Sequence, residues 1–162
     1  MQRFLVGSIG ILAAVGAAVL FHVIITAVLG IALSTILSGL TFLDPLYAGD
    51  RLESIWSTLA TLLLLHGIHT LTTAPLVGGT IARLQSRYLS RNFYLIGAFL
   101  SLGLYFVLAF IFRALWPILF SEGLSANVWR ISLIFTGLFA PLIGLTAVFA
   151  VRRWSKSNDG QK

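Results

Sequence analysis

Four long apolar stretches dominate the chain, and almost all of its charged residues lie between or outside them. The stretches cover residues 4–37, 55–81, 93–120 and 128–151. About 20 helical residues cross a hydrocarbon layer of ~30 Å, so each stretch is long enough to span a bilayer. Only 10% of the 162 residues are charged, whereas a soluble domain carries about 25%. The pattern predicts an all-α integral membrane protein, a bundle of four spanning helices.

The first apolar stretch is longer than a bilayer requires. A helix over residues 4–37 would reach about 50 Å at ~1.5 Å per residue. Gly30 and the Ser34–Thr35 pair are candidate break points. We therefore predict that the first span covers about 4–30, and that a short interfacial helix follows until Asp44-Pro45, where the proline disfavours helix in the residue before it.

The domain organisation follows from the same stretches. The chain is too short for a second globular domain, so we expect one transmembrane domain over residues 1–154. Its remaining spans are predicted at about 55–81, 93–120 and 128–151, and a polar cytoplasmic tail at 155–162.

Charged and aromatic residues give the same predicted orientation. If the N-terminus is cytoplasmic, eight basic residues lie on that side, namely Arg3, Arg83, Arg87, Arg91, Arg152, Arg153, Lys156 and Lys162. Three lie near the far side, namely Arg51, Arg113 and Arg130. An excess of Lys and Arg marks cytoplasmic loops, and Trp and Tyr gather at both membrane boundaries, as the four Trp residues do here. Both termini are therefore predicted in the cytoplasm, and in a bacterium the membrane would be the inner one.

Several function classes are excluded or disfavoured by what the chain lacks. It contains no cysteine, which excludes disulfides, thiolate metal sites and cysteine nucleophiles. No short motif of a hydrolase, a phosphate-binding loop or a dinucleotide-binding fold occurs. The net charge is +6, and the basic residues that cause it lie at the ends of the predicted helices. We therefore interpret them as a topology signal and not as a nucleic-acid-binding surface. We assign no catalytic residue and no metal site.

Small residues at helical spacing predict where the helices pack. Close backbone approach drives helix association in lipid, where no hydrophobic force acts between helices. Such residues recur in the first, third and fourth stretches, namely Gly7, Gly10, Ala14, Ala17, Ala18, Gly97, Ser101, Gly137, Ala140, Gly144 and Ala147. We expect these residues at helix–helix contacts.

The three histidines all fall within predicted spans. His66 and His69 share one face of the second span, and His22 lies in the first. Ionisable residues inside a membrane are costly and often functional. Our first expectation is structural, in which each imidazole bonds a carbonyl or threonine of a neighbouring helix. The alternatives are ligation of a haem b, binding of a quinone, or a proton path.

Five arginines are candidates for binding outside the hydrocarbon core. Arg83, Arg87 and Arg91 repeat every four residues, so on a continuous helix they would form a ridge that binds anionic lipid or a cytoplasmic partner. Arg113 and Arg130 lie near the outer ends of their spans. They would extend to the headgroups, pair with a local carboxylate such as Glu122, or form an ion pair with another subunit.

Three functions remain open on this evidence. The small size, the packing residues and the absence of catalytic motifs favour an accessory or structural subunit of a larger membrane complex, with other subunits or further copies as partners. The histidines support a redox subunit that binds haem b or quinone as the alternative. A small oligomeric transporter or channel is the third, based on Pro75, Pro141, the Gly78–Gly79 pair and threonines of the second span.

Overall fold

The computed structural model describes residues 2–43, 48–85, 93–119 and 126–159, and all of them are helical. They form α1 (Gln2–Leu43), α2 (Ala48–Gln85), α3 (Phe93–Leu119) and α4 (Ala126–Asp159). The all-α prediction and the number of long helices are therefore confirmed. Each helix contains a segment long and apolar enough to cross a membrane.

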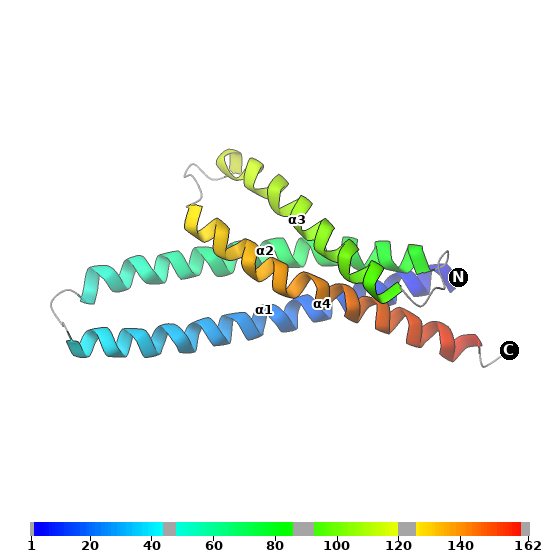
Figure 1. Cartoon of the computed structure of the whole chain (residues 1–162), viewed down its shortest axis with the longest axis horizontal. Coiled ribbons are helices and arrows are strands. Elements are labelled where there is room, and N and C mark those ends of the chain that lie inside the picture. The colour runs from blue at the N-terminus through cyan, green and yellow to red at the C-terminus, as the bar shows by residue number, and fades with distance from the viewer. Residues whose placement is uncertain (1, 44–47, 86–92, 120–125, 160–162) are drawn as a thin grey trace.

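The four helices form two antiparallel hairpins, α1–α2 and α3–α4 (Figure 1). Helix α1 begins and α4 ends at the same end of the bundle, and α2 ends and α3 begins there too (Figure 1). Helices α2 and α4 are central, because α1 packs on both of them and α3 also packs on both. Within the described residues α1 and α3 do not contact each other.

The predicted interfacial helix after the first span is wrong. Helix α1 runs without interruption through Gly30 to Leu43. The hydroxyls of Ser34 and Thr35 both donate to the Ile31 carbonyl, at 2.8 and 2.9 Å, so these polar groups are satisfied inside the helix and do not break it.

Two other helix boundaries also differ from the prediction. Helix α2 begins at Ala48, so Asp50 and Glu53 belong to a helix and not to an extended outer loop. Helix α4 continues to Asp159, so most of the predicted tail is helical. The Ser155 hydroxyl there donates to the Val151 carbonyl at 3.1 Å. Apolar content predicts the membrane-crossing segments, but helical hydrogen bonding carries each helix on into polar sequence.

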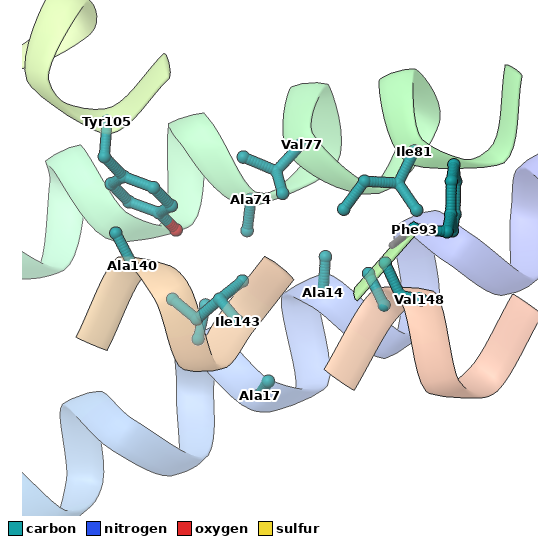
Figure 2. Packing of buried hydrophobic residues seen from close by; sticks show 12 residues of the cluster. Ala14, Ala17, Ala74, Val77, Ile81, Phe93, Tyr105, Ala140, Ile143 and Val148 are labelled. Carbon is teal, nitrogen blue, oxygen red and sulfur yellow. The ribbon is translucent and has the colours of Figure 1, made fainter. Parts of the chain in front are cut away.

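Small and β-branched side chains fill the space between the helices. Figure 2 shows the centre of this core, where every helix contributes buried residues, namely Ala14, Ala17, Ala18, Ala74, Val77, Ile81, Phe93, Tyr105, Ala140, Ile143, Ala147 and Val148. The alanines predicted to pack on α1 and α4 are all buried. Short side chains let the helix backbones approach closely, which increases dispersion contacts where burial from water is not the driving force.

Glycines make the closest contacts in both hairpins. In the first, a Cβ added at Gly78 would overlap the Gly10 backbone, and one added at Gly10 would lie 2.6 Å from the Gly78 carbonyl oxygen. In the second, a Cβ at Gly144 would overlap the Gly97 carbonyl. Gly10, Gly97 and Gly144 were expected at packing faces. Gly7 was also expected there, but a Cβ at Gly7 would meet nothing within 4 Å.

Candidate functional site

His22 of α1 and His66 of α2 meet between the two helices of the first hairpin. Their Nδ1 atoms are 3.5 Å apart, their ring centroids are 5.8 Å apart, and the ring planes differ by 11°. The centroid distance exceeds the Nδ1–Nδ1 distance by about the width of one imidazole ring. Each Nδ1 therefore lies on the line that joins the two ring centres and points at the other Nδ1. The rings are therefore parallel and meet edge to edge, without overlap of their faces.

The sequence next to His66 makes room for His22. A Cβ added at Gly67 would lie 2.9 Å from Cε1 and 3.1 Å from Nε2 of His22, so a side chain there would displace the His22 ring. His66 itself is 2% exposed, and Phe135 of α4 packs against it edge-on at 6.1 Å between ring centroids. The His22 ring thus lies directly on the α2 backbone, and α4 covers the far side of His66.

Thr70 adds a third polar atom to this pair. Its Oγ1 lies 3.5 Å from the Nδ1 of His66, one helical turn away on α2, and the residue is buried. His66 Nδ1 therefore has two polar neighbours, the Nδ1 of His22 on α1 and the hydroxyl oxygen of Thr70 on its own helix.

His69 does not join this group. Its Nε2 lies 3.0 Å from the Tyr105 carbonyl oxygen of α3, and because a carbonyl can only accept, Nε2–H is the donor. The Tyr105 hydroxyl in turn donates to the Thr70 carbonyl at 3.0 Å, and the rings of His69 and Tyr105 meet edge-on. These two bonds join α2 to α3, which is the structural role first expected of the histidines.

Ligation of a haem b by His22 and His66 would require a different arrangement of the two imidazoles, and haem b and quinone binding stay predictions. Ligation by both would place the porphyrin plane between the rings, yet their edges are only 3.5 Å apart and Gly67 is in contact with the His22 ring. A macrocycle several ring widths across would have to separate α1 from α2. Within the described side chains, moreover, no group of three or more His, Cys, Asp or Glu residues comes together as a metal-binding cluster. In this arrangement the two imidazoles are in hydrogen-bond contact with each other.

Several threonines of α2, including Thr73 beside the histidines, bond to the backbone of their own helix. The hydroxyls of Thr61, Thr72, Thr73 and Thr80 each donate to the carbonyl four residues earlier, at 2.7 to 2.8 Å. Threonines in membrane helices commonly satisfy themselves in this way. Each of these hydroxyls is therefore satisfied within its own helix.

The structure describes three of the five arginines that were candidates for binding. Arg83 lies exposed near the end of α2, whereas Arg87 and Arg91 lie outside the described residues, so the cationic ridge stays a prediction. The guanidinium of Arg113 lies over the Trp129 ring, with its carbon 5.3 Å from the ring centroid. Arg130 is exposed on α4. The carboxylates named as partners for Arg113 lie outside the described side chains, and ion pairs with other subunits remain predictions.

One cationic contact was not anticipated from the sequence. Arg152 lies over two aromatic rings, with its guanidinium carbon 4.7 Å from the Tyr94 centroid and 5.6 Å from that of Phe93. The contact links the end of α4 to the start of α3. Its sequence signal is an arginine and an aromatic pair at the same predicted membrane boundary, where such contacts are favourable.

Comparison of the chain with protein-family models, with curated proteins and with solved structures found no match. Function therefore has to be argued from the chain's own residues.

Proposed function

We propose that this chain is a non-catalytic integral membrane protein that serves as an accessory subunit of a larger membrane complex. The observation that supports it best is the unequal length of the two hairpins. Helix α1 has 42 residues and α3 has 27, or about 63 and 40 Å at ~1.5 Å per residue. The α1–α2 hairpin extends beyond α3–α4 at the end of the bundle opposite the termini (Figure 1).

The second half of α1 carries exposed apolar side chains. Val28, Ile31 and Ile36 are 59%, 68% and 57% exposed. A hydrocarbon core of ~30 Å matches α3 well, but it covers α1 only if that helix is strongly tilted. These side chains belong to the apolar segment Leu5–Ile36, which lipid or another membrane subunit would cover. The length of α1 beyond what a bilayer needs favours a subunit at its far end.

The proposed orientation puts both termini and the turn between α2 and α3 in the cytoplasm. It is supported by the excess of arginine and lysine at that end of the chain. In a bacterium this would be the inner membrane. The arginines of this end, Arg83, Arg87 and Arg91, would then contact anionic headgroups or a cytoplasmic partner.

Single-cysteine labelling tests the orientation, since the chain has no native cysteine. Intact cells carrying Ser90→Cys should resist a membrane-impermeant maleimide until they are permeabilised, and cells carrying Ser121→Cys should react at once. Labelling of both positions from outside, or of Ser90→Cys alone, contradicts the proposed topology.

Purification from its native membrane in a mild detergent tests the proposed assembly. We expect the chain to elute with other membrane proteins, and we expect Ile31→Ser combined with Ile36→Ser to weaken that association. The matched control is Leu95→Ser combined with Phe99→Ser on α3, whose side chains are as exposed but lie away from the extending hairpin. A monomeric chain that brings no partner contradicts the accessory role.

A further inference from the structure

We propose that His22 and His66 form a binding site for one proton, which the two rings share between α1 and α2. The proposal goes beyond the accessory role and does not depend on it. It rests on the hydrogen-bond contact between the two Nδ1 atoms, on the burial of His66 and on the chemistry of the neighbouring side chains.

The contact fixes the tautomers of the two rings relative to each other. A neutral imidazole carries a proton on one ring nitrogen and a lone pair on the other. A hydrogen bond between two Nδ1 atoms therefore needs the proton on Nδ1 of one ring and on Nε2 of the other. The donor ring keeps a lone pair on its Nε2, and this is the nitrogen of the pair that can take up a further proton without loss of the contact.

Uptake of one proton strengthens the contact, and uptake of two breaks it. A proton from water at that Nε2 forms an imidazolium, whose Nδ1–H still donates to the neutral ring. The bond is then charge-assisted, and such bonds are shorter, so the separation of 3.5 Å should decrease. A second proton would have to go to the accepting Nδ1, and two N–H groups would then face each other. The intact pair therefore holds one additional proton.

Burial assigns this proton to His22. The His66 side chain is buried, whereas His22 is half-buried. A charged group costs more free energy where water is excluded, so the imidazolium forms at the more exposed ring. His22 is then the donor through its Nδ1–H, and His66 is the neutral acceptor.

The Thr70 hydroxyl supports His66 in either state of the pair. Other threonines of α2, such as Thr73, donate to the carbonyl four residues earlier, but Thr70 Oγ1 lies 3.5 Å from the Nδ1 of His66. A hydroxyl both donates and accepts, so it adapts to the direction of the bond between the rings. The Thr70 carbonyl accepts from the Tyr105 hydroxyl, which holds this turn of α2 against α3.

The surroundings hold no carboxylate that would take the place of the neutral ring. All five acidic residues lie at positions 44, 50, 53, 122 and 159, away from the middle of every span. Among the described ionisable groups, His22 and His69 are the ones that act on the charge of His66. His69 already donates to the Tyr105 carbonyl of α3. The residue of α4 that packs on His66 is Phe135, which carries no charge.

The basic residues of the described helices also lie away from the pair. Arg113 of α3 lies over the Trp129 ring, and Arg130 of α4 is exposed. Arg83 lies near the end of α2, and Arg152 near the end of α4. Uptake of the proton therefore depends on the two imidazoles themselves, which should titrate as one unit.

The test is 15N nuclear magnetic resonance of the full chain, labelled at histidine and reconstituted in lipid, between about pH 8 and about pH 4. The nitrogen chemical shifts distinguish a lone-pair nitrogen, an N–H and an imidazolium. With only three histidines in the chain, single variants assign the signals. We expect His22 and His66 in opposite tautomers at the alkaline end. At the acid end we expect an imidazolium at His22 and a neutral ring at His66.

His66→Leu tests whether the proton is shared. His22 loses its acceptor in this variant, so its affinity for the proton should fall about tenfold or more, because a hydrogen bond from a charged donor is lost. His69→Gln is the matched control, since His69 bonds to α3 and not to His22. It should leave the titration of His22 unchanged.

Gly67→Ala tests the geometry while both histidines are kept. The added methyl group would lie 2.9 Å from the His22 ring, so the ring must move away from His66. The affinity of His22 for the proton should then fall as it does in His66→Leu. Gly16→Ala on α1 is the matched control, because a Cβ there meets nothing within 4 Å.

The wild type alone can overturn the proposal, whether or not the variants fold. The pair is only a contact between helices if both rings have the same tautomer at the alkaline end, if two imidazoliums form together, or if neither ring is protonated at about pH 4. Among variants with the circular dichroism spectrum of the wild type, an unchanged titration of His22 in His66→Leu or in Gly67→Ala has the same meaning.

Discussion

The two hairpins close in the same way but carry different polar contacts. In each, glycine backbones touch near the end of the bundle where the termini lie, Gly10 with Gly78 and Gly97 with Gly144. Farther along the first hairpin, His22 and His66 face each other at 3.5 Å. In the second, the Ser101 hydroxyl donates to the Ala140 carbonyl at 2.5 Å.

The difference separates a bond of fixed direction from a contact whose direction can reverse. The serine has one proton to donate and a helix carbonyl to receive it, so nothing further is needed there. The imidazole pair is joined by a hydrogen-bond contact between two Nδ1 atoms, in which either ring can be the donor. Similar backbone packing can therefore hold either a bond of fixed direction or one that depends on the histidine tautomer.

The largest expected effect comes from filling the glycine contacts. An alanine at Gly78 would meet the Gly10 backbone, and one at Gly144 would meet the Gly97 carbonyl. Backbone cannot move aside as a side chain can, so we expect each variant to lose about 3 kcal/mol of unfolding free energy. Thermal unfolding in detergent measures this loss. A loss of stability in only one of the two variants would contradict the view that both hairpins depend on a glycine contact.

Gly16→Ala and Gly103→Ala are the controls for these two variants. A Cβ at either position meets nothing within 4 Å. Alanine also favours helix over glycine by roughly 0.5–1 kcal/mol, so the controls should be neutral or slightly stabilised. If the controls lose as much stability as Gly78→Ala, the close contacts are not the cause.

These glycine contacts show how far the sequence could predict the fold. Spacing of small residues identified the packing faces of α1, α3 and α4, because lipid leaves close approach as the main source of helix association. Gly78 was interpreted as a feature of a transporter, since its partner Gly10 lies 68 positions away and no local pattern links them. The continuity of α1 was also missed, because local bonds of Ser34 and Thr35 made their apparent break harmless.

The candidate site was predictable in its residues but not in its pairing. Spacing put His66 and His69 on one face, whereas the structure turns His69 toward Tyr105 and brings His22 to His66. No pattern in the sequence pairs His22 with either histidine of the second span. The true register is fixed by long-range contacts such as that of Gly67 with the His22 ring, which the sequence does not display.

A smaller effect is expected at Gly97, which distinguishes the two hairpins further. A Cβ there would overlap Cγ2 of Val148, a side-chain atom, so Gly97→Ala should cost about 1–2 kcal/mol. Val148→Ala removes the Cγ2 methyl group that the new Cβ would overlap. The double variant Gly97→Ala with Val148→Ala should therefore recover part of the lost stability. A double-mutant cycle on unfolding free energies measures the coupling, and strictly additive effects would contradict this contact.

Ser101→Ala should cost less than either glycine change. The variant loses a buried hydroxyl donor, while the Ala140 carbonyl keeps its place in the hydrogen bonding of α4. Polar bonds between membrane helices contribute about 0.6 kcal/mol on average, with a maximum of about 1.7 kcal/mol, and we expect a value near the upper part of this range because the bond is short. Thermal unfolding in detergent measures this loss. A loss as large as that of Gly144→Ala would contradict a single polar bond as its cause.

The smallest effect is expected at Arg113, at the outer part of the second hairpin. Its guanidinium lies over Trp129, and an exposed contact of this kind contributes about 0.5–1 kcal/mol. Arg113→Gln should therefore destabilise the chain by about 0.5 kcal/mol. Arg130→Gln, which removes the same charge from an exposed position, should change stability less.

Arg113→Lys distinguishes the ring contact from an ion pair with another subunit. Lysine keeps the positive charge, so it would preserve an ion pair. Lysine replaces arginine poorly over an aromatic ring, so it would not preserve the contact with Trp129. Full recovery by Arg113→Lys in the assembled complex would thus favour the ion pair over the ring contact.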